Sequence, residues 1–456
     1  MCGVLMYSDS FARYFDPDNM KYNLATDSPD YYLKLRGPDS ENEIYSNGVY
    51  FRHYHLMISM NPISQPIESE EYVILFNGEI YNNNTGFVDG ANIVPALLES
   101  PEYFTNLLDG EFAVIIYDKI NNILQLATDP FGSKPLFFGI NKFGVVAASY
   151  SSVISSLGLK PKRVAANTII TISLDDLAIL KISHPHRWLI TRAASSLDDW
   201  CIAFENSMRK RIDSTEQIPY FGLSGGYDSG VISCFLSKLK ESKSLPVLVL
   251  NKKEQSVQIQ RASHFEDSII LNWSQLTEDA AIRYAEKRIQ PLRCIEYSTG
   301  SGYYSDKPMI DDSGFKKLIA VANAGDSKGR KVFLDGMGGD EIYSDYGWNG
   351  QPLGIHSNFG GRFPDNILSI VPSNPYDKSA RWASFYNSTM STYLAKSEHV
   401  IGSFGHESRY PLLDKSLVKC FLSLPAAIKN SKYKAPLDYY MSLHNWPVLR
   451  GVKHGF

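Results

Sequence analysis

The sequence predicts two successive domains: an α+β domain built around an antiparallel β-sandwich, and an α/β domain built around a parallel sheet. The chain has 456 residues, whereas one domain typically holds about 100 to 200. Hydrophobic residues make up 44% and charged residues 21%, a composition typical of folded globular proteins. The spacing of the apolar runs changes near residue 190, which divides the chain into predicted domains 2–190 and 191–456.

The first half contains short apolar runs that alternate with polar residues or are continuous. Clusters of Gly, Asn, Asp and Pro separate these runs, as expected for strands joined by tight turns. The clearest predicted strands are Glu71–Phe76, Phe112–Tyr117, Val145–Ala148 and Thr168–Ile172. We therefore expect a mostly antiparallel, layered sandwich with a few helices.

The second half alternates amphipathic segments of helix length with short apolar strands. The predicted helices are Leu197–Arg211 and Val231–Glu241, and the predicted strands are Leu245–Leu250 and Lys331–Leu334. This alternation is typical of a parallel sheet covered by helices.

Charge and hydropathy indicate small-molecule partners. The formal net charge of −4 provides no broad field to attract nucleic acid or an anionic membrane. No apolar run approaches the roughly 20 residues of a spanning helix, and no basic region followed by an apolar stretch opens the chain. We expect a cytoplasmic protein without nucleic-acid or membrane partners.

Cys2 differs from the other cysteines by its position. The five cysteines form no CxxC pair, which argues against a zinc cluster or a disulfide framework. Removal of Met1 would leave Cys2 with a free α-amine of pKa about 7.8 beside a thiol of pKa about 8.5, so that the amine serves as the base. The remaining four are expected to be buried thiols: Cys201, Cys234, Cys294 and Cys420.

Four short motifs follow Cys2, and each alone is an ordinary turn. They are Arg36–Asp39 (RGPD), Phe76–Asn82 (FNGEIYN), Asp109–Ala113 (DGEFA) and Asp129–Leu136 (DPFGSKPL). In this order after Cys2 they resemble the class II glutamine amidotransferase domain, over residues 2–182. The resemblance implies a fold of the N-terminal-nucleophile type and the release of ammonia from glutamine.

The resemblance also implies roles for individual residues. The Cys2 thiolate attacks the glutamine side-chain amide, while Asn77 and Gly78 donate hydrogen bonds to the oxyanion. His55 stands where the family usually has an arginine, and an imidazole does not reproduce the bidentate guanidinium fork. Either glutamine or free ammonia therefore remains open as the working nitrogen donor. The expected glutamine contacts are Arg36, His55, Glu79 and Asp89.

A Ser- and Gly-rich turn follows an apolar strand at Tyr220–Ile232 and leads into a helix. Backbone N–H groups at such a turn favour a bound phosphate, although a plain helix cap has the same pattern. The Gly-Lys-Ser/Thr ending of a Walker loop is missing. The turn resembles the SGGxDS loop of ATP pyrophosphatases, which implies ATP contacts from Leu223, Ser224, Gly225, Gly226, Asp228 and Ser229.

A second glycine turn lies at Leu334–Tyr343 and resembles the GxGxDE segment of asparagine synthetases. The resemblance implies that Gly336 and Gly338 contact ATP and that Asp340 shares Mg²⁺ with Asp228. Two hard carboxylates suit this cation. Farther on, Lys432–Leu437 resembles the family's KxxLR segment, so that Lys434, or alternatively Lys432, stabilises the charge of the phosphates.

These resemblances predict a glutamine-dependent asparagine synthetase that adenylates aspartate with Mg-ATP and lets ammonia displace AMP. Members of the family are often dimers, so a homodimer is a further expectation. Met337 replaces a common glutamate, and a thioether cannot accept a proton; Tyr227 and Gly230 also depart from the family. Two alternatives stay open: amidation of another carboxylate, such as a sugar, peptide or metabolite acid, and a non-catalytic sensor of glutamine or nucleotide.

Overall fold

The chain forms two compact units in the computed structural model. The first comprises Met1–Arg187, Glu286–Pro291 and Gly402–His406, and the rest of the chain forms the second. None of the helices described is both long and apolar enough to cross a bilayer. Asp89 and Cys294 fall outside the residues that the structure describes, which are 2–15, 28–58, 63–81, 108–190, 196–239, 243–292, 308–345, 347–349, 351–352, 357, 359–377 and 379–450.

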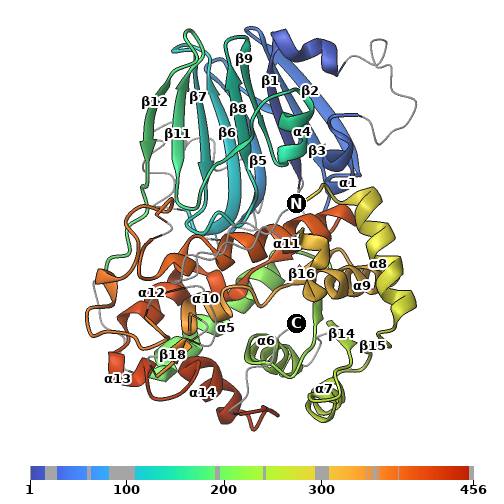
Figure 1. Cartoon of the computed structure of the whole chain (residues 1–456), viewed down its shortest axis with the longest axis vertical. Coiled ribbons are helices and arrows are strands. Elements are labelled where there is room, and N and C mark those ends of the chain that lie inside the picture. The colour runs from blue at the N-terminus through green and yellow to red at the C-terminus, as the bar shows by residue number, and fades with distance from the viewer. Residues whose placement is uncertain are drawn as a thin grey trace. The chain divides into compact units, whose positions relative to one another are not determined.

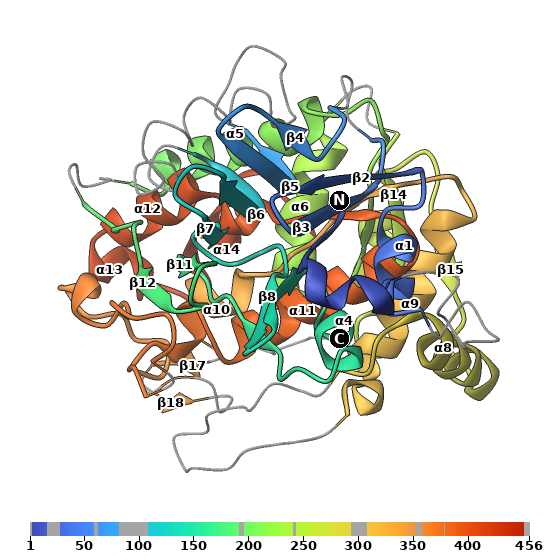
Figure 2. The same cartoon turned by 90° about the horizontal axis from the view of Figure 1, so that it is seen from above.

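Two antiparallel sheets form the first unit, and Figure 2 shows their strands in two rows. Among the described residues, one sheet has the order β10 (Lys162–Arg163), β8 (Phe137–Asn141), β9 (Gly144–Ala148), β1 (Gly3–Ser8), β3 (Val49–His55) and β2 (Ser40–Ser46). The other has the order β12 (Ile179–Ser183), β11 (Ile169–Ser173), β7 (Ile123–Thr128), β6 (Gly110–Asp118), β5 (Tyr72–Ile80) and β4 (Ile67–Glu68). The predicted antiparallel sandwich is confirmed.

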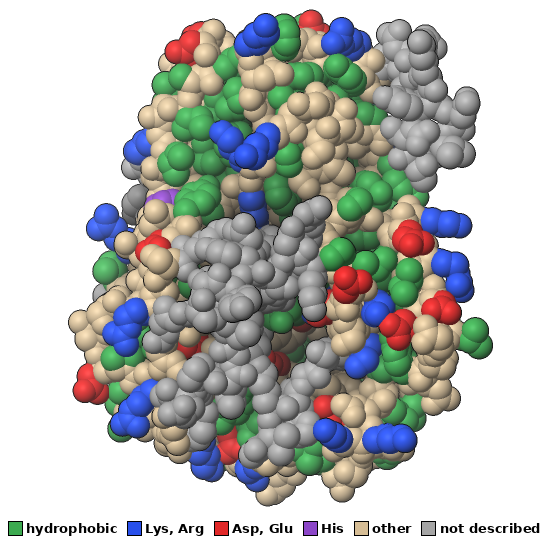
Figure 3. Space-filling model, viewed as in Figure 1, with side chains coloured by type: hydrophobic (Ala, Val, Ile, Leu, Met, Phe, Trp, Pro, Cys, Tyr) green, Lys and Arg blue, Asp and Glu red, His purple; other side chains and the backbone are tan. Residues whose placement is uncertain are grey.

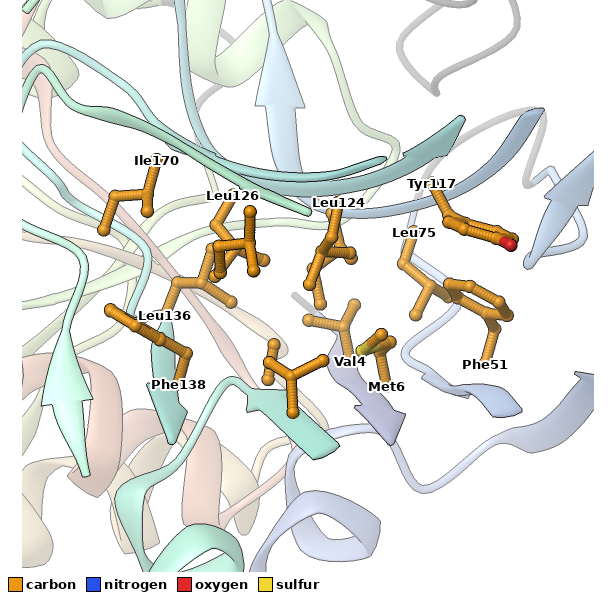
Figure 4. Packing of buried hydrophobic residues seen from close by; sticks show 14 of the residues in the cluster. Val4, Met6, Phe51, Leu75, Tyr117, Leu124, Leu126, Leu136, Phe138 and Ile170 are labelled. Carbon is orange, nitrogen blue, oxygen red and sulfur yellow. The ribbon is translucent and has the colours of Figure 1, made fainter. Parts of the chain in front are cut away.

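The core of the first unit lies between the two sheets. Alternate residues of each strand point to this layer, where Val4, Met6 and Phe51 of one sheet meet Leu75 and Leu124 of the other (Figure 4). The opposite face of the β1 sheet packs against α1 (Tyr31–Arg36) and α4 (Ser151–Ser156). Period-two burial therefore accounts for the strand pattern in the sequence.

A parallel sheet lies in the second unit, and Figure 1 labels its strands β14, β15 and β16. In the part of the chain described, its order is β15 (Ile269–Leu271), β14 (Leu245–Val249), β13 (Tyr220–Gly222), β16 (Val332–Leu334) and β19 (Glu407–Arg409). From the central pair β13 and β16, the sheet continues through β14 to β15 on one side and to β19 on the other. Ligands of such sheets bind where the strand order reverses, beyond the carboxyl ends of the strands. The predicted parallel sheet is confirmed.

Helices and one small hairpin complete the second unit. Helix α9 packs against β13 and β14, while α6 packs against α5 and α14. The described helices are α5 (Leu197–Asp213), α6 (Tyr227–Ser237), α7 (Gln255–Ala262), α8 (Gln275–Arg288), α9 (Ser313–Asp326), α10 (Gly339–Tyr343), α11 (Thr389–Ser403), α12 (Lys415–Ser423), α13 (Ala426–Lys429) and α14 (Ala435–Leu443). The hairpin consists of β17 (Gly347–Trp348) and β18 (Gln351–Pro352). Short 3-10 helices lie at Asp9–Tyr14, Met309–Asp311, Ile367–Ser369, Ala383–Phe385 and Pro411–Leu413.

Two details differ from the sequence prediction. The helix predicted at Val231–Glu241 begins earlier, at Tyr227, and ends at Ser237. Its first turn follows directly from the extended cap residue Gly226, whereas the apolar pattern reports only the packed part of the helix. Cys201 and Cys234 are buried as predicted, but Cys420 is only half-buried because it lies beside the buried face of α12.

Charged side chains are dispersed over the face of the molecule drawn in Figure 3. Lys and Arg as well as Asp and Glu side chains occur there among apolar ones. Both signs of charge are thus present among the described side chains of this face.

Candidate functional site

The layer between the sheets of the first unit becomes polar at one end. Val73 and Leu75 of β5 belong to the apolar core, and strand alternation places Asn77 and Glu79 on the same face. The same continuation occurs on β1, β3 and β6. The buried polar residues that extend the inward-facing positions are Cys2, His53, His55, Asn77, Glu79 and Glu111.

Hydrogen bonds hold the backbone of Cys2 in this polar layer. Its N–H donates to Asn77 Oδ1 at 2.8 Å, and Arg36 Nε donates to its carbonyl oxygen at 2.9 Å. The guanidinium of Arg36 also donates to the hydroxyl of Tyr150 at 3.0 Å. Arg36 is fully buried, so it positions the backbone of Cys2, and its predicted contact with glutamine stays a prediction. No local pattern in the sequence indicated Tyr150.

Asn77 and Gly78 have the geometry expected near an oxyanion site. Asn77 Nδ2 is buried and meets no hydrogen-bond partner among the residues described, a loss of about 1–3 kcal/mol that a bound acceptor would remove. Gly78 has φ +130°, and a Cβ at this position would lie 1.8 Å from the carbonyl oxygen of Glu111. Glycine is therefore required where β5 and β6 approach.

Buried charges lie beside Asn77. Glu79 on β5 is directly opposite Glu111 on β6, and Lys134 Nζ lies 3.8 Å from Glu111 Oε2. Glu79 thus lies buried in the polar layer with Asn77. Its contact with the glutamine amine stays a prediction. The sequence motifs contained Glu111 and Lys134 but gave neither a role.

The two histidines of β3 are neutral at pH 7. Burial lowers the pKa of His55, and it lowers the pKa of His53 to about 3. His55 is therefore suited to a hydrogen bond with the glutamine carboxylate but not to an ion pair. This contact stays a prediction.

A cavity of about 270 Å³ opens beyond the carboxyl ends of the parallel strands in the second unit. The turn Leu223–Gly226 follows β13, and the turn Asp335–Gly338 follows β16, its neighbour in the sheet. Adjacent parallel strands thus bring the two glycine turns to one place. Of the residues predicted from the sequence, those that line the cavity are Ser224, Gly226, Asp228, Ser229, Gly336, Met337 and Asp340.

Three predicted ATP residues shape the turns and are absent from the cavity lining. Leu223 is buried and donates its N–H to the carbonyl of Val247 at 2.9 Å. Gly225 donates its N–H to Glu254 Oε2 at 2.7 Å. Gly338 has φ +91°, and a Cβ there would lie 2.2 Å from the side chain of Leu413. Direct ATP contacts of the three stay predictions.

Lys434 joins the two aspartates predicted to bind metal. Its Nζ lies 2.6 Å from Asp228 Oδ1 and 2.9 Å from Asp340 Oδ1, so these oxygens cannot be farther apart than the sum of the two distances. Burial opposes the charge of Lys434, but the aspartates prevail and raise its pKa well above the ordinary value. Two converging carboxylates are hard oxygen ligands that suit Mg²⁺. The alternative, Lys432, has a 63% exposed side chain paired with Asp438.

The structure explains the departures at Tyr227 and Gly230. Arg261 is fully buried and donates to the carbonyl oxygens of Ser224 at 2.6 Å and Gly226 at 2.8 Å. A Cβ at Gly230 would lie 2.7 Å from this guanidinium. The ring of Tyr227 packs edge-on against that of Tyr433, whose hydroxyl donates to Asp340 Oδ1 at 3.0 Å. Sequence reasoning missed Arg261.

Further charged groups line the same cavity. Lys396 Nζ lies 3.6 Å from Asp312 Oδ1 and 4.5 Å from the ring centre of Tyr393. Asp335 is the first residue after β16, and its carboxylate accepts hydrogen bonds from Met337 N at 3.1 Å and Ser397 Oγ at 2.5 Å. Basic and acidic side chains therefore both line the cavity, in addition to the residues of the glycine turns.

Comparison with known proteins identifies two matched regions. Residues 1–176 match the family model described as glutamine amidotransferase domain, and residues 201–441 match the one described as asparagine synthase. A Methanocaldococcus jannaschii protein named as a glutamine-hydrolysing asparagine synthetase is 26% identical over 91% of this chain and 76% of its own length. Asparagine synthetase 3 of Bacillus subtilis is 23% identical over 76% of this chain and 64% of its own length. Amidase chry2 of Gibberella zeae is 22% identical over 68% of this chain and 54% of its own length.

The resemblance inferred from the motifs is therefore confirmed, although the chain spans less than two thirds of the Bacillus and Gibberella relatives. The predicted enzyme class, a ligase that takes nitrogen from glutamine, is the class of this family. The asparagine synthase match alone covers more than half of the residues of this chain, and the chain therefore belongs to the asparagine synthase family.

Proposed function

We propose that the protein is a glutamine-dependent asparagine synthetase, which hydrolyses glutamine at Cys2 and uses the ammonia to amidate an adenylated aspartate. One observation carries this proposal. The Lys434 ammonium lies between Asp228 and Asp340 beside a cavity formed by two glycine turns. This arrangement suits a nucleotide whose phosphates need both a metal and a fixed positive charge.

The glutaminase half of the reaction uses the polar end of the sandwich. After removal of Met1, the α-amine of Cys2 takes the thiol proton and the sulfur attacks the glutamine amide. Asn77 Nδ2 donates to the oxyanion, while Arg36 holds the carbonyl of Cys2. Ammonia leaves, and water hydrolyses the thioester to glutamate.

The synthetase half uses the cavity of the second unit. Asp228 and Asp340 would hold Mg²⁺, which neutralises phosphate charge when bound. Lys434 stabilises the α-phosphate as the substrate carboxylate attacks it and pyrophosphate departs. Ser224, Gly226 and Ser229 line the cavity and would meet the nucleotide there, while Arg261 keeps the turn in shape.

Aspartate suits the charges elsewhere in the cavity. Lys396 and Asp312 present an ammonium and a carboxylate, which match the α-carboxylate and α-ammonium of an amino acid. The cytoplasmic location and the homodimer expected from the sequence stay predictions.

The direct test is incubation of the protein with glutamine, aspartate and Mg-ATP. We expect asparagine, glutamate, AMP and aspartate-dependent pyrophosphate. A protein that makes no asparagine and releases no aspartate-dependent pyrophosphate contradicts aspartate as the substrate.

A second candidate function is amidation of a different carboxylate, and Met337 favours it. Its thioether lines the cavity where asparagine synthetases commonly carry a glutamate, so the acyl pocket is changed near the reacting groups. Pyrophosphate release screened over sugar acids, peptides and metabolite acids distinguishes this candidate, because only the true substrate raises it above the background without acid.

A further inference from the structure

Amide formation requires a proton acceptor in the cavity of the second unit. When ammonia attacks an acyl adenylate, the new C–N bond leaves the nitrogen with an excess proton. Met337 lines the cavity but cannot accept a proton. A carboxylate that faces the same space and is free of cationic partners is therefore needed.

The carboxylates of the cavity differ in their partners. Asp228 and Asp340 hold Lys434, and Asp312 holds Lys396 and caps α9 through Phe315 N. Asp335 instead accepts hydrogen bonds only from neutral donors and forms no ion pair with any residue that the structure describes. We propose that Asp335 is the general base of the amide-forming step; this inference rests on the proposed function.

The position of Asp335 suits this role. It follows β16 directly, is 7% exposed and is one of the residues that line the cavity. The bonds from Met337 N and Ser397 Oγ fix its carboxylate. Ser397 in turn lies 3.0 Å from Ser408 Oγ. A base held by two neutral donors keeps a defined direction towards the substrate.

The electrostatic surroundings also suit a base. Burial raises the pKa of Asp335 to about 6, against the lowering effects of Ser397, Met337 N and Lys396. Glu398 of α11 raises it further, and the tyrosines that face it, Tyr220 and Tyr410, are neutral because burial raises their pKa values. At pH 7 the carboxylate is thus mostly ionised yet basic enough to take a proton.

Two bonds change at the acyl carbon in this step. The lone pair of ammonia forms the C–N bond to the acyl carbon, and the C–O bond to AMP breaks with its electron pair remaining on the phosphate oxygen. Asp335 takes one proton from the nitrogen, which leaves a neutral amide. The protonated carboxyl later releases that proton to solvent.

The test is D335N with ammonia as the nitrogen donor, so that Cys2 is bypassed. Asn keeps the size and an acceptor oxygen for Met337 N. Aspartate-dependent exchange of labelled pyrophosphate into ATP reports adenylation, and asparagine formation reports the complete reaction. We expect exchange within about threefold of wild type and amide formation reduced about 100- to 10,000-fold, as for loss of a general base.

Three outcomes overturn the inference. Equal loss of exchange and amide formation in D335N assigns Asp335 a structural role. Unchanged amide formation removes it from the reaction, and a selective loss in E341Q but not in D335N moves the base to Glu341, the other cavity carboxylate.

If the wild-type protein shows no exchange with aspartate, the acid selected by the pyrophosphate screen replaces aspartate in the test. If no acid supports exchange, the proposed function fails before any variant is made, and this inference falls with it.

A pH profile provides a readout that a structural role would not move. The rate of amide formation in wild type should fall as the pH drops through about 6, because a protonated Asp335 cannot accept a proton. S397A removes a donor that stabilises the carboxylate, so this acidic limb should move to higher pH. A limb that stays in place in S397A, or that persists in D335N, overturns the assignment.

Discussion

At the residue scale, the amide of Asn77 has two tasks. Its oxygen accepts the N–H of Cys2 at 2.8 Å, while its nitrogen lies buried without a partner in the part of the chain described. The two tasks can be separated by substitution, because aspartate keeps the acceptor and loses the donor.

We predict that N77D reduces the rate of glutamine hydrolysis about 100- to 1,000-fold, the usual loss when one oxyanion donor is removed. Glutamate release measures this effect. Ammonia-dependent synthesis in the same variant is the control and should be unchanged. Full glutaminase activity in N77D would remove Asn77 from the oxyanion site.

The roles of residues could be predicted where a sequence motif indicates them. They could not be predicted where they depend on tertiary contacts. Asp228, Asp340 and Lys434 were all implied by the resemblance of their motifs to known families, and Lys434 Nζ lies within 2.9 Å of both carboxylates. Arg261 binds a turn 35 to 37 residues away, and no local pattern records such a contact. Asp335 lies in the second glycine turn, just after the predicted strand Lys331–Leu334, and nothing in the sequence assigned it a role; its burial and its place in the cavity lining suggested one.

At the scale of the element, two turns share one cavity because β13 and β16 are neighbours. Strand, glycine turn and helix were each evident in the sequence from hydrophobic period and turn residues. The neighbour relation was not, because strand order in a parallel sheet depends on non-local packing. The early start of α6 at Tyr227 has a local reason instead, since its cap residue Gly226 belongs to the glycine turn and adds nothing to the apolar pattern.

We predict that R261K raises the ATP concentration needed for half-maximal pyrophosphate exchange about 10- to 100-fold. Lysine lacks the Nε–H that donates to the carbonyl of Pro447 at 2.9 Å and anchors the guanidinium against the turn, and buried charged hydrogen bonds contribute about 1.5–3 kcal/mol. The exposed residue Arg283 of α8 provides the matched control R283K, which should behave like wild type. An unchanged ATP dependence in R261K would show that the turn keeps its shape without this fork.

At the scale of the whole molecule, each unit carries its own set of reactive side chains. The described residues of the polar layer of the sandwich all belong to the first unit, and every residue of the cavity lining belongs to the second. The order of the motifs along the chain predicted two chemistries. It did not predict that Glu286–Pro291 and Gly402–His406 join the first unit, because such returns depend on packing rather than on sequence order.

We predict that C2A abolishes the use of glutamine and retains ammonia-dependent amide formation at a rate within about threefold of wild type, because only the nucleophile is removed. Product formation with each nitrogen source measures the two activities. Failure of the wild-type protein to make product from either source would instead favour a sensor of glutamine or nucleotide.

The hydrogen bond between Cys2 and Asn77 crosses from one sheet of the sandwich to the other. The gap that it spans is maintained by the bulk of Val4, Leu75 and their neighbours, since facing sheets stand about 10 Å apart only when side chains fill the space. The apolar core thus sets the position of the Cys2 sulfur relative to Asn77. Shortening a leucine in this core would first misalign the attacking sulfur, so the reaction at the polar end of the layer limits which residues the core can accept.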